Sequence, residues 1–186
     1  MKNRIVLGLA GGLAVAGLVF AAAATGARYG NDYARDRAEV DDLLARYSFA
    51  LDWQDPELYA STFTEDGVLI WAGGTVTGRK AIVNEMRNAK AADERAIAAT
   101  APLRPFRRRH FITNVVLKID GDRATERGYW FEFNNDNPDR KPYVGAYGHQ
   151  QDDLKRVNGR WYFARRQIFN EQIGRASCRE RVFSSV

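Results

Sequence analysis

Three side chains of the sequence could together move protons: His110, Asp52 and Tyr47. Histidine titrates near neutral pH, so it can act as an acid or a base, and a nearby carboxylate can fix its tautomer. A tyrosine hydroxyl can polarise a carbonyl group or donate to a departing oxygen. Elimination of water across a C–C bond needs such a set, because a base takes the carbon-bound proton while an acid protonates the leaving hydroxyl.

Each of the three also has a structural interpretation. His110 follows three arginines in an expected strand and could be an ordinary strand histidine. Asp52 could be a turn residue, although an acid in the last turn of a helix opposes the helix dipole. Tyr47 lies on an apolar stripe and could belong to the core. Tyr47 and Asp52 are also about 140° apart around an ideal helix, so they converge only if the helix end unwinds.

Other residues are candidates for a pocket around this set. His149, the second histidine, is a secondary catalytic candidate and shares a strand face with Tyr147. The expected substrate-binding residues are mostly aromatic, which suits an apolar substrate. The aromatic residues among them could equally well belong to the core. The expected substrate-binding residues are Trp53, Tyr59, Trp71, Tyr129, Phe131, Tyr147 and Arg165. For Arg165, a surface salt bridge is the alternative.

The elements that must position these side chains follow from periodicity. An apolar stripe at helical spacing predicts a helix that ends near Asp52, and Pro56 opens a short second one. A third helix is expected over residues 79–89, and residues 90–106 are expected to form a long connection. Alternating or β-branched runs predict strands over residues 68–71, 75–77, 108–119, 123–133, 143–157 and 160–169. Helices first and strands last predict an α+β fold: a cone-shaped barrel whose curved, mixed or antiparallel sheet and three N-terminal helices enclose a pocket.

Both ends of the chain are expected to lie outside the domain at residues 31–172. Residues 1–27 have the basic start, apolar run and small-residue exit of a signal peptide, or form an uncleaved N-terminal anchor. The protein is thus expected to be exported, periplasmic or secreted, or anchored in the inner membrane by that segment alone. Residues 173–182 match the translation of a sequencing adapter, and we interpret residues 173–186 as non-native read-through; a natural basic tail is the alternative.

Composition excludes several classes of function. The formal charge of +5 lies mostly in the two end segments, so the domain itself has no electrostatic footprint for nucleic acid. The single cysteine, Cys178, is in the suspect tail, which leaves no thiol nucleophile or disulfide in the domain. No short-range metal-ligand motif and no glycine-rich nucleotide loop is present, so neither a metal nor a cofactor is expected.

Several motifs resemble the SnoaL-like domains of the nuclear-transport-factor-2-like superfamily, particularly the branch around scytalone dehydratase and bile-acid 7α-dehydratase. The resemblance spans about residues 35–170 and is carried by Arg46-Tyr47-x4-Asp52, Leu58-x4-Phe63-x2-Asp66-Gly67, Gly78-Arg79-x-Ala81-Ile82, Arg109-His110-Phe111-Ile112-Thr113-Asn114, Asp120-Gly121-Asp122-x-Ala124 and Asn158-Gly159-Arg160-Trp161. It implies catalytic roles for Tyr47, Asp52 and His110.

The resemblance implies a cofactor-independent lyase or isomerase with dehydratase-like acid/base chemistry on a mostly apolar, hydroxylated or keto small molecule. Because the fold hosts many functions, two alternatives stay open. One is a non-catalytic small-molecule-binding module. The other is an accessory subunit resembling the β subunit of ring-hydroxylating dioxygenases. A homodimer or homotrimer is expected in either case.

Overall fold

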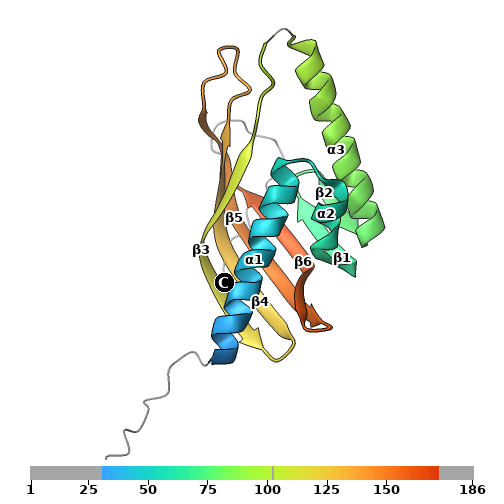
Figure 1. The fold of residues 1–186 in the computed structure, drawn as a ribbon, viewed down its shortest axis with the longest axis vertical. Helices are drawn as coiled ribbons and strands as arrows, with labels where there is room; N and C mark the ends of the chain where they lie inside the picture. Colours follow the sequence, from blue (N-terminus) through green and yellow to red (C-terminus); the bar gives the residue numbers. More distant parts are fainter. Residues whose placement is uncertain (1–30, 102, 172–186) are drawn as a thin grey trace, which may run out of the picture.

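The computed structural model describes residues 31–101 and 103–171 (Figure 1). The proposed signal or anchor segment and the proposed read-through tail fall outside these residues. Within the described ranges, no helix has the length and apolar character needed to cross a membrane.

In the described part of the chain, three helices precede most of the sheet. Helix α1 (Asn31–Asp52) buries a stripe at the expected spacing, including Val40, Leu43 and Tyr47. Helix α2 (Pro56–Ser61) begins with proline, and the Asp55 side chain caps it by accepting a hydrogen bond of 2.9 Å from Leu58 N. Helix α3 (Arg79–Ala99) is ten residues longer than the sequence predicted, because the alanine-rich stretch after residue 89 continues the helix instead of forming a loop.

The strands form one six-stranded sheet in the order β2-β1-β6-β5-β4-β3. Strand β1 runs parallel to β6, and the other neighbours are antiparallel, so the sheet is mixed. Strands β2 and β3 are its two edges. The bounds are β1 (Phe63–Trp71), β2 (Gly74–Thr77), β3 (Arg109–Asp120), β4 (Arg123–Asn134), β5 (Tyr143–Val157) and β6 (Arg160–Asn170).

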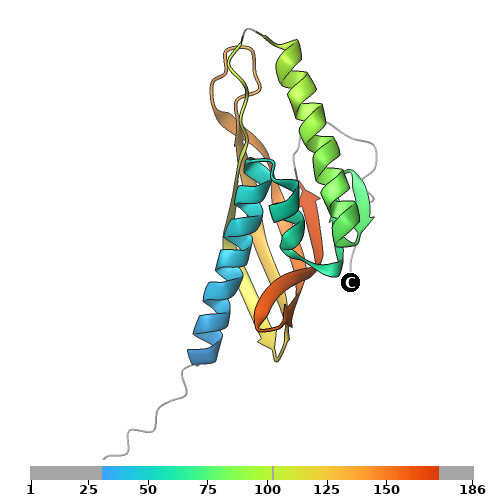
Figure 2. The same cartoon turned by 45° about the vertical axis from the view of Figure 1, so that its right-hand side comes forward.

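The predicted α+β fold is confirmed, with the sheet curved but open rather than closed into a barrel. The helices lie on one side of the sheet (Figure 2). Helix α1 packs against β3 and β6, whereas α3 packs against β1 and β2, with α2 between the helices. The core lies between α1 and the concave face, where Phe63, Trp161 and Phe163 are fully buried or nearly so.

One buried ionic cluster interrupts this apolar core. The guanidinium of Arg166 binds Asp152 at 2.7 Å and the Gln150 amide, and it lies 3.9 Å from the Tyr47 ring centroid. Gln150 in turn donates to the buried Glu126 carboxylate at 3.2 Å. Burial raises the pKa of Asp152 well above its ordinary value, despite the opposing charge of Arg166.

Candidate acid/base site

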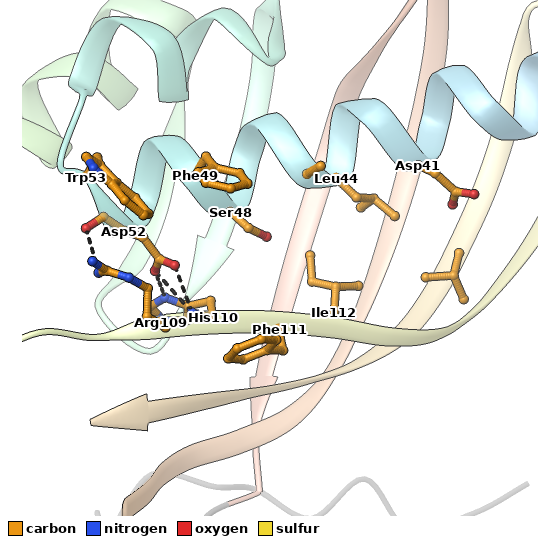
Figure 3. Close-up of a pocket in the computed structure, with 12 residues that line it drawn as sticks. Asp41, Leu44, Ser48, Phe49, Asp52, Trp53, Arg109, His110, Phe111 and Ile112 are labelled. Carbon is orange, nitrogen blue, oxygen red and sulfur yellow. Dashed lines mark hydrogen bonds and ion pairs between the residues drawn. The ribbon is translucent and has the colours of Figure 1, made fainter. Parts of the chain in front are cut away.

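The carboxylate of Asp52 connects the end of α1 to the edge strand β3. Asp52 accepts hydrogen bonds of 3.1 Å from the backbone N–H of His110, and its Oδ1 lies 2.7 Å from the ring Nδ1 (Figure 3). A strand at the edge of a sheet has backbone donors without a strand partner, and Asp52 satisfies one of them. The predicted contact between Asp52 and His110 is therefore present, in a geometry that also fixes the ring.

A second carboxylate holds the other ring nitrogen. Glu132 of β4 is the cross-strand partner of His110, and its Oε2 lies 3.1 Å from His110 Nε2. Glu132 Oε1 also accepts a bond of 3.3 Å from Ala146 N on β5. A side chain at Gly145 would place Cβ 2.7 Å from Glu132 Oε1, so the glycine leaves room for this carboxylate.

Glu132 is not among the site residues predicted from the sequence. It stands in an aromatic run, and its role depends on the pairing of β3 with β4, which the sequence does not state. Side chains along a strand alternate between its two faces, so Glu132 lies on the same face as Trp130. This alternation could have identified Glu132 as inward-facing if Trp130 had been placed inward.

The three side chains are largely shielded from water. The exposed fractions of the side chains are 6% for Asp52, 19% for His110 and 12% for Glu132. Burial alone lowers the pKa of His110, but the hydrogen bonds and charges of Asp52 and Glu132 outweigh it and raise the pKa above 6.5. Burial raises the pKa of Glu132, but the His110 hydrogen bond and charge outweigh it and lower the pKa. The arrangement thus favours an imidazolium that donates to both carboxylates.

A groove of about 530 Å³ runs between α1 and β3 beside this set. Asp52, Trp53, Arg109 and His110 lie at one end of it and Asp41 at the other (Figure 3). Most of the lining between them is apolar. The lining residues are Asp41, Leu44, Ala45, Ser48, Phe49, Asp52, Trp53, Arg109, His110, Phe111, Ile112 and Val115. Trp53, an expected substrate-binding residue, is therefore in the wall of the groove.

Two of the expected tyrosines belong to the core rather than to the groove. Tyr47 and Tyr59 are almost fully buried, and the Tyr59 hydroxyl donates to the Tyr47 hydroxyl at 2.9 Å. Helix α1 stays helical to Asp52, so Tyr47 and Asp52 remain on different sides of it. The predictions that Tyr47 joins the catalytic set and that Tyr59 binds the substrate are therefore wrong in this geometry.

Other expected pocket residues point away from His110. Tyr129 and Phe131 are exposed or half-buried on the convex face of the sheet, opposite the helices, and pair with His149 and Tyr147 on β5. The alternation along each strand was correctly predicted, but the convex face was mistaken for the pocket side. Arg165 and Trp71 are also absent from the groove: Arg165 hydrogen-bonds Gln167 on the convex side, and Trp71 ends β1.

His149, the secondary catalytic candidate, is consequently separated from His110 by the sheet. Its ring stacks on Phe169 with centroids 4.4 Å apart, and Nδ1 contacts Glu171. The two histidines cannot share one small substrate. The groove between α1 and β3 is lined by His110 and not by His149.

The side chains of Asp52, His110 and Glu132 are not arranged to bind one metal ion. Asp52 and Glu132 lie on opposite ring nitrogens of His110, so they cannot both approach one ion together with it. Across residues 31–101 and 103–171, no three His, Cys, Asp or Glu side chains are grouped so that they could hold a metal ion.

Comparison with known proteins agrees with this fold. The model of the SnoaL-like domain matches residues 32–167, and the chain belongs to this family. The family includes polyketide cyclases and dehydratases. Among curated protein sequences, none matches this chain.

Several solved structures have a similar fold, and one of them is a complex with a compound. A function-unknown protein, Rv3472, from Mycobacterium tuberculosis is 27% identical, with a TM-score of 0.62 over 75% of this chain and 78% of that one. A protein from Catenulispora acidiphila, solved with S-DNPA, is 28% identical, with a TM-score of 0.61 over 74% and 95%. ActVI-ORFA from Streptomyces coelicolor is 21% identical, with a TM-score of 0.62 over 75% and 97%, a likeness of fold alone.

Proposed function

We propose that this protein is a cofactor-independent lyase or isomerase that uses His110, held by Asp52 and Glu132, as its acid/base group. The substrate class is a mostly apolar small molecule with a hydroxyl or keto group. The observation that carries the proposal is the Asp52 contact to His110 Nδ1 at 2.7 Å, at the end of an apolar groove. Membership of a family with dehydratases and cyclases supports this class of chemistry.

In a dehydration, the C–H bond next to a carbonyl breaks, a C=C bond forms, and the C–O bond to the hydroxyl breaks with loss of water. Glu132 first takes the Nε2 proton of the ring, the neutral ring of His110 then takes the carbon-bound proton, and the imidazolium so formed gives that proton to the departing hydroxyl, which leaves as water. Glu132, which is ionised when His110 is charged, is close enough to His110 to receive or return a proton through the ring. Asp52 touches Nδ1 and the backbone and thereby orients the ring. It is a positioning residue in this scheme.

A dehydration assay tests the proposal without knowledge of the natural substrate. The probe is a β-hydroxy ketone that bears a phenyl ring, because loss of water gives a conjugated enone with strong ultraviolet absorbance. The wild-type chain is expected to form the enone faster than buffer. His110→Gln is expected to lose a factor of about 100 to 10,000, the usual contribution of general acid–base catalysis.

His149→Gln is the matched control, because it removes the other histidine from the opposite side of the sheet. It is expected to leave the rate unchanged. Equal losses in the two variants would contradict the proposal. If the probe bound in the groove but the wild type did not accelerate enone formation, a non-catalytic binding module would be the better conclusion.

A further inference from the structure

The groove has a cation, Arg109, at the end where His110 lies, and this cation takes no part in the ion pairs of His110 with Asp52 and Glu132. Of its charged lining residues, Asp41 pairs with Arg37 at 3.0 Å, and Asp52 pairs with His110. Arg109 forms no ion pair with an acidic side chain in the described part of the chain. A cation at the end of a mostly apolar groove favours a ligand with a negative charge at that end.

The Arg109 side chain is held in place by contacts that leave part of its guanidinium available. Its Nη1 donates to the backbone oxygens of Arg108 at 2.6 Å and Asp52 at 3.4 Å. Its guanidinium carbon lies 4.1 Å from the ring centroid of Trp53. No bond involves Nε or Nη2 among the described residues. These two donors match the spacing of a carboxylate, which guanidinium groups bind through two parallel hydrogen bonds.

We propose that the groove binds an apolar, preferably aromatic, carboxylic acid, with its carboxylate on Arg109 and its apolar body along Leu44, Ala45 and Ile112. This inference rests on the proposed function and narrows its substrate class, because it places the carboxylate next to His110. The carbon atoms close to the carboxylate would then be the ones that exchange protons. Trp53 and Phe49, both 60% exposed and 5.2 Å apart between ring centroids, offer an aromatic wall at the same end.

A helix-capping role for Arg109 accounts for its Nη1 contacts at the end of α1, and it needs no ligand. The two roles differ in what they predict. A cap affects stability and has no preference between charged and neutral ligands. A carboxylate site discriminates between two ligands that differ only in charge.

The test compares naphthylacetate with its neutral analogue naphthylethanol by calorimetric titration of the full-length chain. The wild type is expected to bind the anion about tenfold tighter or more, a factor that corresponds to about 1.4 kcal/mol. Arg109→Gln is expected to abolish this preference while retaining affinity for the alcohol, which shows that the groove is intact. Arg109→Lys is expected to keep part of the preference, because it retains the charge but not the paired donors.

Arg107→Gln is the matched control. It removes the same charge two residues away, from an exposed side chain that does not line the groove. It is expected to keep the full preference for naphthylacetate. Equal affinity for both probes, an equal loss in Arg107→Gln, or no binding of either probe at millimolar concentration would each overturn the inference.

The binding test is independent of catalysis, because the probes do not react. If His110→Gln loses dehydration activity but keeps the preference for the anion, both the proposed function and the carboxylate site stand. If the wild type shows the preference but no activity, only the proposed function fails. If it shows activity without the preference, only the carboxylate site fails.

Discussion

Asp52 binds His110 at two points, since its carboxylate accepts the backbone N–H at 3.1 Å and contacts ring Nδ1 at 2.7 Å. The first contact fixes the edge of the sheet against the end of α1, and the second fixes the ring. One side chain therefore links the tertiary structure to the candidate chemistry. Asp52 is unfavourable for the helix dipole at the end of α1. Its contacts with His110, 58 residues away, explain why an aspartate is present there.

Asp52→Asn is expected to lower the catalytic rate on the phenyl β-hydroxy ketone by a factor of about 100 or more, because a neutral amide no longer stabilises the imidazolium. The pKa of His110, followed by NMR titration, is expected to fall in the same variant. Asp41→Asn is the control, as it removes an acid from the far end of the groove, where Asp41 pairs with Arg37. An unchanged pKa of His110 in Asp52→Asn would contradict the assignment.

Glu132 and His110 make the stability of the protein depend on pH in opposite directions. The lowered pKa of Glu132 stabilises the fold above the unfolded value, about 4.3, and this contribution is lost as pH falls through the folded pKa. The raised pKa of His110 stabilises the fold below the unfolded value, about 6.5, and this contribution is lost as pH rises through the folded pKa.

Both contributions are present together between those two unfolded values. The free energy of unfolding of Glu132→Gln, measured in urea from acid to neutral pH, is therefore expected to fall furthest below that of the wild type in this window. Glu171→Gln, which changes the carboxylate beside His149, serves as the control. A difference in unfolding free energy that does not vary with pH would show that Glu132 contributes to stability through packing and not through its charge.

Tyr47 and Tyr59 are expected to matter for stability and not for chemistry. Tyr47→Phe and Tyr59→Phe each remove the same buried hydrogen bond, which is worth about 0.5–1.5 kcal/mol. The double variant is therefore expected to lose less than the sum of the two single losses in urea unfolding. Dehydration rates are expected to stay within about twofold of the wild type. A large loss of rate in Tyr47→Phe alone would restore the catalytic role that the sequence indicated.

Arg166 and its neighbour Arg165 form a matched pair for testing the buried cluster. Arg166→Met leaves Asp152 and Glu126 buried without their cation and is expected to cost about 3–5 kcal/mol of unfolding free energy. Arg165→Met changes a side chain on the convex face and is expected to cost less than about 0.5 kcal/mol. Equal effects in thermal or urea unfolding would mean that the cluster is not the stabilising feature.

The sequence predicted most of the fold because its signals are local. The stripe through Val40 and Leu43 defines α1, and Pro56 marks the start of α2. Helix α3 was underestimated because its second half has few apolar residues, although alanine continues a helix readily. The contact between Asp52 and His110 was anticipated only through the family resemblance, since 58 residues separate the two.

The errors in the candidate site come from long-range information. Period-two alternation shows that Tyr147 and His149 share a face, but it does not show which face is inward. The register between β3 and β4 decides that Glu132 meets His110, and no local pattern states that register. Tyr47 was assigned to the site by its position in a family motif, whereas the regular end of α1 directs it into the core.

The state of the His110 ring tests the central claim most directly. Nitrogen-15 NMR of the histidines at pH 7 distinguishes a ring with two protonated nitrogens from a neutral tautomer. The contacts to Asp52 and Glu132 predict that a larger fraction of His110 has both nitrogens protonated at this pH than of a free imidazole, and that Asp52→Asn and Glu132→Gln each shift the ring toward the neutral form. A wild-type His110 that is neutral at pH 7, with a pKa unaffected by either substitution, would contradict the proposed acid/base site.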